Sequence, residues 1–131
     1  MLVVDSSVWI NYFNGIQSTQ TDFLDRALGV QSIAVGDLIL TEVLQGFRSD
    51  KDFDTARKVL LEFDQVEMLG QSRAISAASK FRKLRKYGIT IRKTNDVIIA
   101  SYCIDEQIPL LFSDRDFDPF VSKLRLIAAN P

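Results

Sequence analysis

The sequence begins MLVVDSSVWI, residues 1–10, and this stretch sets the expectations for the rest of the chain. Leu2 to Val4 form a short, uninterrupted apolar run, which is typical of a strand buried on both faces. Asp5 stands where this strand would end, and Ser6 or Ser7 is placed to cap a following helix. Because ligands of open parallel sheets bind beyond the carboxyl ends of the strands, Asp5 is predicted to lie where such folds perform chemistry.

The composition narrows the possible classes of protein. The 131 residues fit one domain, residues 1–131, and the hydrophobic content of 47% is enough for a packed core. The formal net charge of -1 gives no whole-chain sign of nucleic-acid binding, so any basic surface has to be local. A single cysteine, Cys103, excludes an internal disulfide and suits a reducing cytoplasm. With no apolar run of membrane-spanning length and no basic segment before the apolar start, we expect a cytoplasmic protein without a signal peptide or membrane contact.

Histidine is absent from the sequence, which excludes every mechanism that depends on a histidine general base. Serine and cysteine hydrolases with a histidine partner are excluded on the same ground, and so are most zinc enzymes. If the chain is an enzyme, carboxylates or lysines must therefore carry its acid–base and metal chemistry.

Predicted strands alternate with predicted helices along the chain. After the first strand, short apolar runs predict strands at residues 32–35, 66–69, 109–112 and 124–127. Apolar spacings of three and four residues predict helices at residues 8–13, 19–28, 38–47, 53–63, 72–87 and 97–104. This alternation is typical of an α/β fold with a mostly parallel sheet.

Acidic residues follow the predicted strands at one edge of the sheet. Asp5 ends the first strand, Asp114 comes directly after the fourth, and Asp116 lies two residues further on. Glu42 lies early in the helix after the second strand, and Asp96 lies at the start of the helix that leads into the fourth. Because helix starts and strand ends share an edge in a parallel sheet, these carboxylates are expected to converge, Asp96 included if its helix begins at that edge.

Each acidic residue also has an ordinary structural explanation. Asp5 and Asp96 suit helix N-termini, and Asp114 and Asp116 suit a turn. Glu42 has apolar neighbours on its helix, and a partly buried glutamate needs a partner. It is the joint placement of the acids at one edge that favours a functional site.

Clustered carboxylates repel one another unless they take up protons or bind a divalent cation. Oxygen ligands without histidine favour Mg²⁺ or Mn²⁺ over Zn²⁺. Such an ion activates water and stabilises charge on a phosphate, so the cluster predicts metal-assisted phosphodiester hydrolysis, with one ion or two. Arg92 and Lys93 precede Asp96 and are placed near the same edge, and Arg115 can contact substrate phosphate or pair with neighbouring acids.

Three segments of the chain form a recognisable pattern, namely LVVDSSVWI at residues 2–10, TEVLQGF at residues 41–47 and TNDVIIASYCIDEQIPLLFSDRDF at residues 94–117. Together with the length, they resemble PIN-domain proteins of the VapC toxin type over essentially the whole chain. The resemblance implies a three-layer α/β/α sandwich around a mostly parallel sheet. It also implies an Mg²⁺- or Mn²⁺-dependent endoribonuclease that is the toxin of a toxin–antitoxin pair, with an RNA substrate, a cognate antitoxin and a homodimeric state.

The same resemblance assigns roles to residues. The four catalytic acids that it implies are Asp5, Glu42, Asp96 and Asp114. Asp5, Asp96 and Asp114 are the expected metal ligands, directly or through water. Glu42 is expected to orient or deprotonate the attacking water, or to bind a second ion.

Two residues are expected to support this site. Ser6 matches the small polar residue that often accompanies the first acid, and Asp116 is an auxiliary acid that competes with Asp114 as the closer metal contact. The candidate RNA-binding residues near the acids are Arg92, Lys93 and Arg115. The densest basic run, at Lys80, Arg82, Lys83, Arg85 and Lys86, is either an RNA backbone track or a solvated helix face.

Three other interpretations remain open. The chain could be a PIN nuclease for RNA processing or turnover without a toxin role, or a non-catalytic binding module that binds no divalent ion. A phosphoryl-transfer domain with an aspartate nucleophile is a third, but its dehalogenase-like form needs a second aspartate two residues after the first. Ser7 stands at that position, which counts against it.

Overall fold

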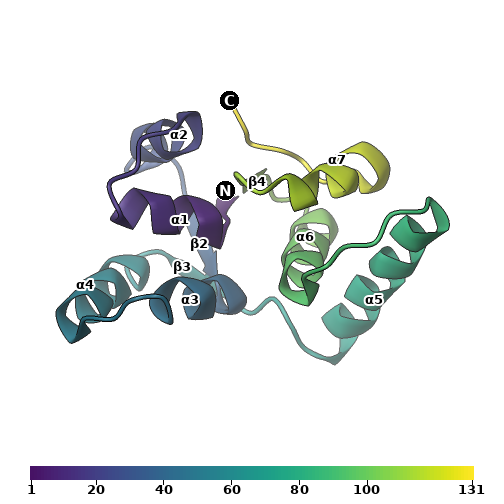
Figure 1. Ribbon diagram of the computed structural model, residues 1–131, viewed down its shortest axis with the longest axis horizontal. Helices are drawn as coiled ribbons and strands as arrows, with labels where there is room; N and C mark the ends of the chain where they lie inside the picture. Colours follow the sequence, from purple (N-terminus) through teal and green to yellow (C-terminus); the bar gives the residue numbers. More distant parts are fainter.

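The computed structural model describes all 131 residues and contains a four-stranded parallel sheet (Figure 1). The strands lie in the order β3-β2-β1-β4 and span Asp64–Val66, Ile33–Gly36, Leu2–Val4 and Leu110–Leu111 respectively. Val3 of β1 is in register with Ala34 of β2 on one side and Leu110 of β4 on the other. All strand pairs are parallel, which confirms the predicted α/β fold with a parallel sheet.

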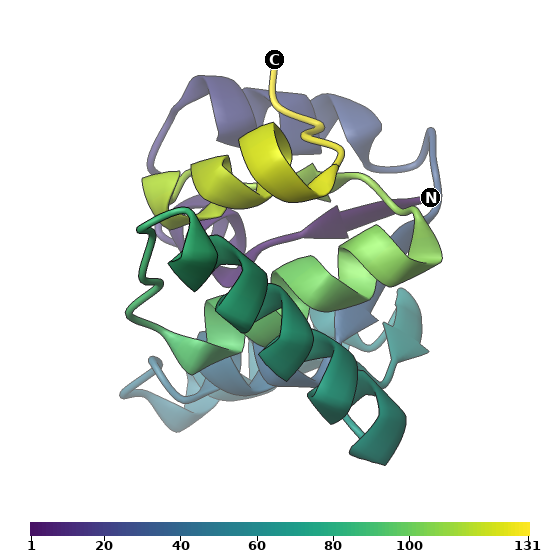
Figure 2. The ribbon, with the colours of Figure 1, turned by 90° about the vertical axis from the view of Figure 1, so that its right-hand side faces the viewer.

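Helices cover both sides of the sheet, so the predicted three-layer arrangement is confirmed (Figures 1 and 2). One side carries α1 (Ser6–Phe13), α2 (Thr19–Ala27), α3 (Asp37–Leu44) and α4 (Asp50–Leu60). The other side carries α5 (Gln71–Lys86), α6 (Thr94–Glu106), the short 3-10 helix η1 (Arg115–Phe117) and α7 (Asp118–Leu124). None of these helices combines the length and the apolar character that crossing a membrane would require.

The strand β1 lies inside the sheet, between β2 and β4, and is fully buried. Leu2, Val3 and Val4 are each at most 1% exposed, as expected for a strand covered on both faces. At the end of the neighbouring strand, a Cβ atom on Gly36 would overlap the side chain of Met68, so glycine at this position leaves room for that buried side chain. Asp37 at the start of α3 holds the segment after β3 in place, because its Oδ1 accepts a hydrogen bond from the Met68 amide at 3.0 Å. The carboxyl edge of the sheet is thus closely packed.

Two predicted strands need correction. The observed β3 shares only Val66 with the prediction at residues 66–69, because an exposed edge strand does not carry the apolar pattern of a buried one. The strand predicted at residues 124–127 is wrong, since α7 occupies this region up to Leu124 and Arg125 then adopts a left-handed φ of 67°. Only Ala128 forms a bridge, which is parallel to Leu110.

Candidate active site

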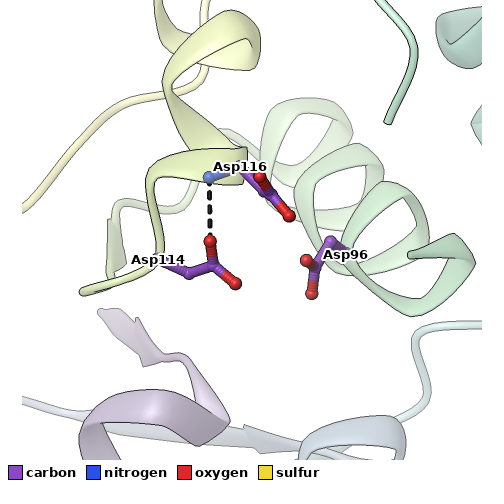
Figure 3. A group of neighbouring side chains, drawn as sticks. All are labelled: Asp96, Asp114 and Asp116. Atoms are coloured by element: carbon purple, nitrogen blue, oxygen red, sulfur yellow. Dashed lines mark hydrogen bonds between the residues drawn. The ribbon is translucent and has the colours of Figure 1, made fainter. Parts of the chain in front are cut away.

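Acidic side chains from two parts of the fold meet at the carboxyl edge of the sheet. Asp96 is in the first turn of α6, and Asp114 and Asp116 lie in the segment that follows β4. One oxygen of each of these carboxylates lies within 4.8 Å of those of the other two. Figure 3 shows the three side chains pointing toward one another. The helix α6 therefore begins at the edge where β4 ends, as the predicted convergence requires.

Asp5 follows β1 directly and is the N-cap of α1. Its Oδ2 accepts hydrogen bonds from the Ser7 hydroxyl at 2.6 Å and from the Ser7 amide at 3.2 Å. Its Oδ1 is buried without a hydrogen-bond partner. Burial raises the pKa of Asp5, the Ser7 hydrogen bonds oppose the rise, and the charge of Glu42 adds to it. Asp5 thus caps a helix with one oxygen and keeps the other unpaired.

Asp96 is the most perturbed acid of the group. It is only 5% exposed, and its Oδ2 has no hydrogen-bond partner. Burial raises the pKa of Asp96 to about 7, and the negative charges of Asp5 and Asp114 contribute to the rise. Asp5 lies outside the group with mutual distances within 4.8 Å, but it is close enough for its charge to act on Asp96.

Glu42 lies half-buried on α3 and reaches the same edge. The hydroxyl of Ser6 donates a hydrogen bond to its Oε1 at 3.2 Å, and its charge contributes to the raised pKa of Asp5 and Asp96. Ser6 therefore supports Glu42, while the first acid is held by Ser7. From the sequence, Ser7 is predicted only as a possible helix cap. Its position two residues after an N-cap aspartate, where it can donate back to the carboxylate, is the signal for its observed role.

Asp114 and Asp116 differ in what protein groups hold them. Oδ1 of Asp114 accepts a hydrogen bond from the Asp116 amide at 2.9 Å, and Oδ2 accepts one from Lys93 Nζ at 3.2 Å. Burial raises the pKa of Asp114, but these two hydrogen bonds and the positive charges of Lys93 and Arg92 together outweigh it and leave the pKa below its ordinary value. No protein group donates a hydrogen bond to the Asp116 carboxylate, so its oxygens are the freer of the two.

The three basic residues expected near the acids are all exposed. Lys93 immediately precedes α6 and pairs with Asp114, so it lies at the acidic cluster. Arg92 contributes to lowering the pKa of Asp114 and is therefore also close to it. Arg115 forms no ion pair, which leaves its guanidinium available to a ligand.

The donor set fits a divalent cation. Three carboxylates converge, and the buried oxygens of Asp5 and Asp96 lack any protein donor, although a buried polar atom normally has one. A hard cation with oxygen ligands and retained waters, such as Mg²⁺ or Mn²⁺, would neutralise this arrangement. Burial and the neighbouring negative charges together raise the pKa of Asp96, and a bound cation would oppose both effects.

The pattern of the whole chain can now be compared with known proteins. The family described as "PIN domain" matches residues 2–120, which is most of the sequence. This chain belongs to the PIN domain family. The family resemblance inferred from the three segments is therefore confirmed.

Curated relatives of this PIN-domain chain extend over nearly its whole length. The VapC ribonuclease Mb1587 of Mycobacterium bovis is 27% identical over 132 residues, which cover 99% of this chain and 98% of the relative. Ribonuclease VapC11 of Mycobacterium tuberculosis matches with the same identity and coverage.

Solved structures share the fold. VapBC2 from Rickettsia felis, bound to a promoter DNA fragment, matches with a TM-score of 0.78 and 17% identity over 99% of this chain and 98% of the solved one. VapC20 of Mycobacterium tuberculosis, described as a sarcin–ricin loop cleaving toxin, matches with a TM-score of 0.70 and 14% identity over the full length of both chains. The backbone arrangement is thus that of these solved structures.

Proposed function

We propose that this PIN-domain chain is a metal-dependent endoribonuclease that acts as the toxin of a toxin–antitoxin pair. The observation that carries the proposal is the convergence of Asp96, Asp114 and Asp116, with Asp5 and Glu42 close enough to act electrostatically on Asp96. The names of the curated relatives, which are VapC ribonucleases matched over 99% of this chain, support the same activity.

Mg²⁺ or Mn²⁺ is the proposed cofactor. Asp5, Asp96 and Asp114 would hold it, and Asp116 competes with Asp114 because its oxygens accept no hydrogen bond from the protein. When bound, such an ion lowers the pKa of a water ligand and stabilises negative charge on a phosphate. The buried, unpaired oxygens of Asp5 and Asp96 are the atoms that gain a partner.

Other residues of the chain position the reactants. Glu42 accepts from Ser6 at Oε1, so its Oε2 is free to orient the attacking water or to accept its proton. The hydrogen bonds from Ser7 hold the Asp5 carboxylate in one orientation. Arg92, Lys93 and Arg115 supply positive charge for the phosphates of the RNA on either side of the cleaved bond.

The proposed setting is a single domain, residues 1–131, in the cytoplasm. The proposed partners are an RNA substrate, a cognate antitoxin and a second copy of the chain. Structures named as VapBC pairs, such as that from Rickettsia felis, support an antitoxin partner.

Cleavage of RNA by the purified chain tests the activity directly. We expect hydrolysis with Mg²⁺ or Mn²⁺, none with EDTA, and a loss of at least about a hundredfold in Asp5→Asn and Asp96→Asn, because each removes a charged ligand from the centre. Asp25→Asn is the matched control, because this acid is exposed on α2 and should leave the rate unchanged. Full activity in EDTA, or in both site variants, would refute the proposal.

A further inference from the structure

Positive charge is concentrated in one continuous part of the chain. Residues 71–95 contain eight of the sixteen lysines and arginines and no aspartate or glutamate. The eight are Arg73, Lys80, Arg82, Lys83, Arg85, Lys86, Arg92 and Lys93. Because the whole chain has a formal net charge of -1, this segment makes a local basic region on a nearly neutral molecule.

Three of these eight side chains form ion pairs within the fold. Arg73 pairs with Glu106 at 2.7 Å, Lys80 pairs with Asp105 at 2.8 Å, and Lys93 pairs with Asp114. The five that form no ion pair are Arg82, Lys83, Arg85, Lys86 and Arg92. The uncompensated charge therefore lies on the second half of α5 and on the connection from α5 to α6.

A cleft opens beside this charge, between residues at the end of α5 and on α7. These two helices lie on the same side of the sheet (Figure 2). It has a volume of about 390 Å³ and is lined by Lys83, Lys86, Tyr87, Lys123 and Leu124. Tyr87 is 61% exposed, and Lys123 Nζ lies 5.1 Å from the centroid of its ring. Three lysines and one exposed aromatic ring thus line the cleft, and no carboxylate does.

We propose that this lysine–tyrosine cleft binds single-stranded RNA, with the three lysines on backbone phosphates and Tyr87 stacked on a base. The inference rests on the proposed function and extends it by naming a substrate surface outside the acidic centre. Proteins that bind single strands combine a positively charged groove with aromatic rings on which bases stack. An acidic peptide would match the lysines but would leave the exposed ring of Tyr87 unexplained.

The cleft is connected to the acidic centre by a short basic path. The chain runs from Tyr87 through residues 88–93 to Lys93, which contacts Asp114, and Arg92 lies on this path. Six residues span at most about 22 Å. A bound segment of a few nucleotides can therefore occupy the cleft while a phosphate of the same strand lies at the carboxylates.

Binding of a fluorescein-labelled single-stranded RNA of about 16 nucleotides, measured by anisotropy in EDTA, tests the cleft without cleavage. The test variant combines Lys83→Gln, Lys86→Gln and Lys123→Gln. The charge-matched control combines Arg26→Gln, Lys51→Gln and Lys58→Gln on α2 and α4, across the sheet from the cleft. We expect the test variant to bind the RNA at least about tenfold more weakly than the wild type. The slope of the logarithm of the binding constant against the logarithm of the salt concentration should become shallower by about 2. The control should bind like the wild type.

Substitution of Tyr87 tests stacking separately from charge. We expect Tyr87→Leu to weaken RNA binding by about fivefold to a hundredfold at an unchanged salt slope, because a base loses its stacking partner. Tyr87→Phe keeps the ring and should bind like wild type. Equal losses in both variants would refute the stacking contact.

The outcomes separate this proposal from the proposed function. In cleavage assays the cleft variants should raise KM with little change in kcat, because they remove binding rather than chemistry. Unchanged RNA affinity in the triple lysine variant would refute the cleft, and so would an equal loss of affinity in the control. A wild-type chain that binds RNA through the cleft but does not cleave it would refute the nuclease proposal and leave the cleft standing.

Discussion

Asp5 serves two purposes that looked like alternatives in the sequence. It caps α1 through Oδ2 and leaves Oδ1 buried and unpaired at the acidic edge. The position of the carboxylate follows from the strand that precedes it, because Asp5 is the first residue after the buried strand β1. The different roles of its two oxygens depend on Ser7, whose hydroxyl and amide both donate hydrogen bonds to Oδ2.

Asp96 should make the metal-free protein less stable as the pH rises. Its pKa is raised from 3.8 to about 7 in the fold, so between about pH 4 and pH 7 the unfolded chain is ionised there while the folded chain still holds the proton. The free energy of unfolding therefore falls over this range and levels off above about pH 7, by at most about 4 kcal/mol from this residue. Urea unfolding in EDTA at a series of pH values measures the fall.

The Asp96→Asn variant is the control for this pH dependence, since it removes the titrating group and keeps the shape of the side chain. Its unfolding free energy should decline less between about pH 4 and pH 8 than that of the wild type. Parallel curves for the two proteins would contradict the raised pKa. Mn²⁺ added at about pH 8 should stabilise the wild type and leave the variant almost unaffected, because a ligand that binds only the folded state stabilises it.

At the scale of secondary-structure elements, Lys80 fastens α5 to α6. Its Nζ donates hydrogen bonds to Ser76 at 2.7 Å, to Ser101 at 2.9 Å and to Asp105 at 2.8 Å. The residue is 9% exposed, so it belongs to neither of the two roles that the basic run suggested, RNA track or solvated face. The sequence could not reveal this, because Ser101 and Asp105 reach Lys80 only when the two helices pack against each other.

Lys80→Met should lower the free energy of unfolding by about 1–3 kcal/mol, because the buried Ser101 hydroxyl loses its partner while the partly exposed Asp105 can be rehydrated. Lys83→Met, one turn further along α5, replaces an exposed lysine and should change stability by less than about 0.5 kcal/mol. Urea unfolding at constant pH compares the two variants. Equal effects would mean that the buried network contributes nothing beyond an ordinary surface lysine.

The strands that the sequence predicts well are those in which every residue is buried. β1 and β2 lie within a residue of the predicted bounds because central parallel strands are continuous apolar runs. The edge strand β3 is misplaced because its residues are polar and exposed. The helix α7 is missed although Asp118 and Pro119 form a helix-start signal, since the apolar run at residues 124–127 suggested a strand instead.

At the scale of the whole molecule, the parallel topology explains why widely separated acids meet. Every strand ends at the same edge, so the residues after β1 and β4 become neighbours whatever their distance in sequence. That logic predicts the convergence of Asp96 and Asp114. The topology alone cannot predict which carboxylates come within 4.8 Å of one another. That depends on how η1 turns Asp116 toward α6 and on which groups donate hydrogen bonds to Asp5.

The proposed toxin role can be tested only in a living cell, by measuring the growth of a bacterial culture that expresses the chain. Induced expression of the wild type and of Asp25→Asn should arrest a bacterial culture, whereas Asp96→Asn should not, because arrest requires hydrolysis at the acidic centre. Co-expression of the small protein from the adjacent reading frame should restore growth. Arrest by Asp96→Asn would point to a cause other than RNA cleavage. Normal growth with the wild type, combined with RNA cleavage by the purified chain, would instead favour a PIN nuclease of RNA processing, because active hydrolysis would then be compatible with the living cell.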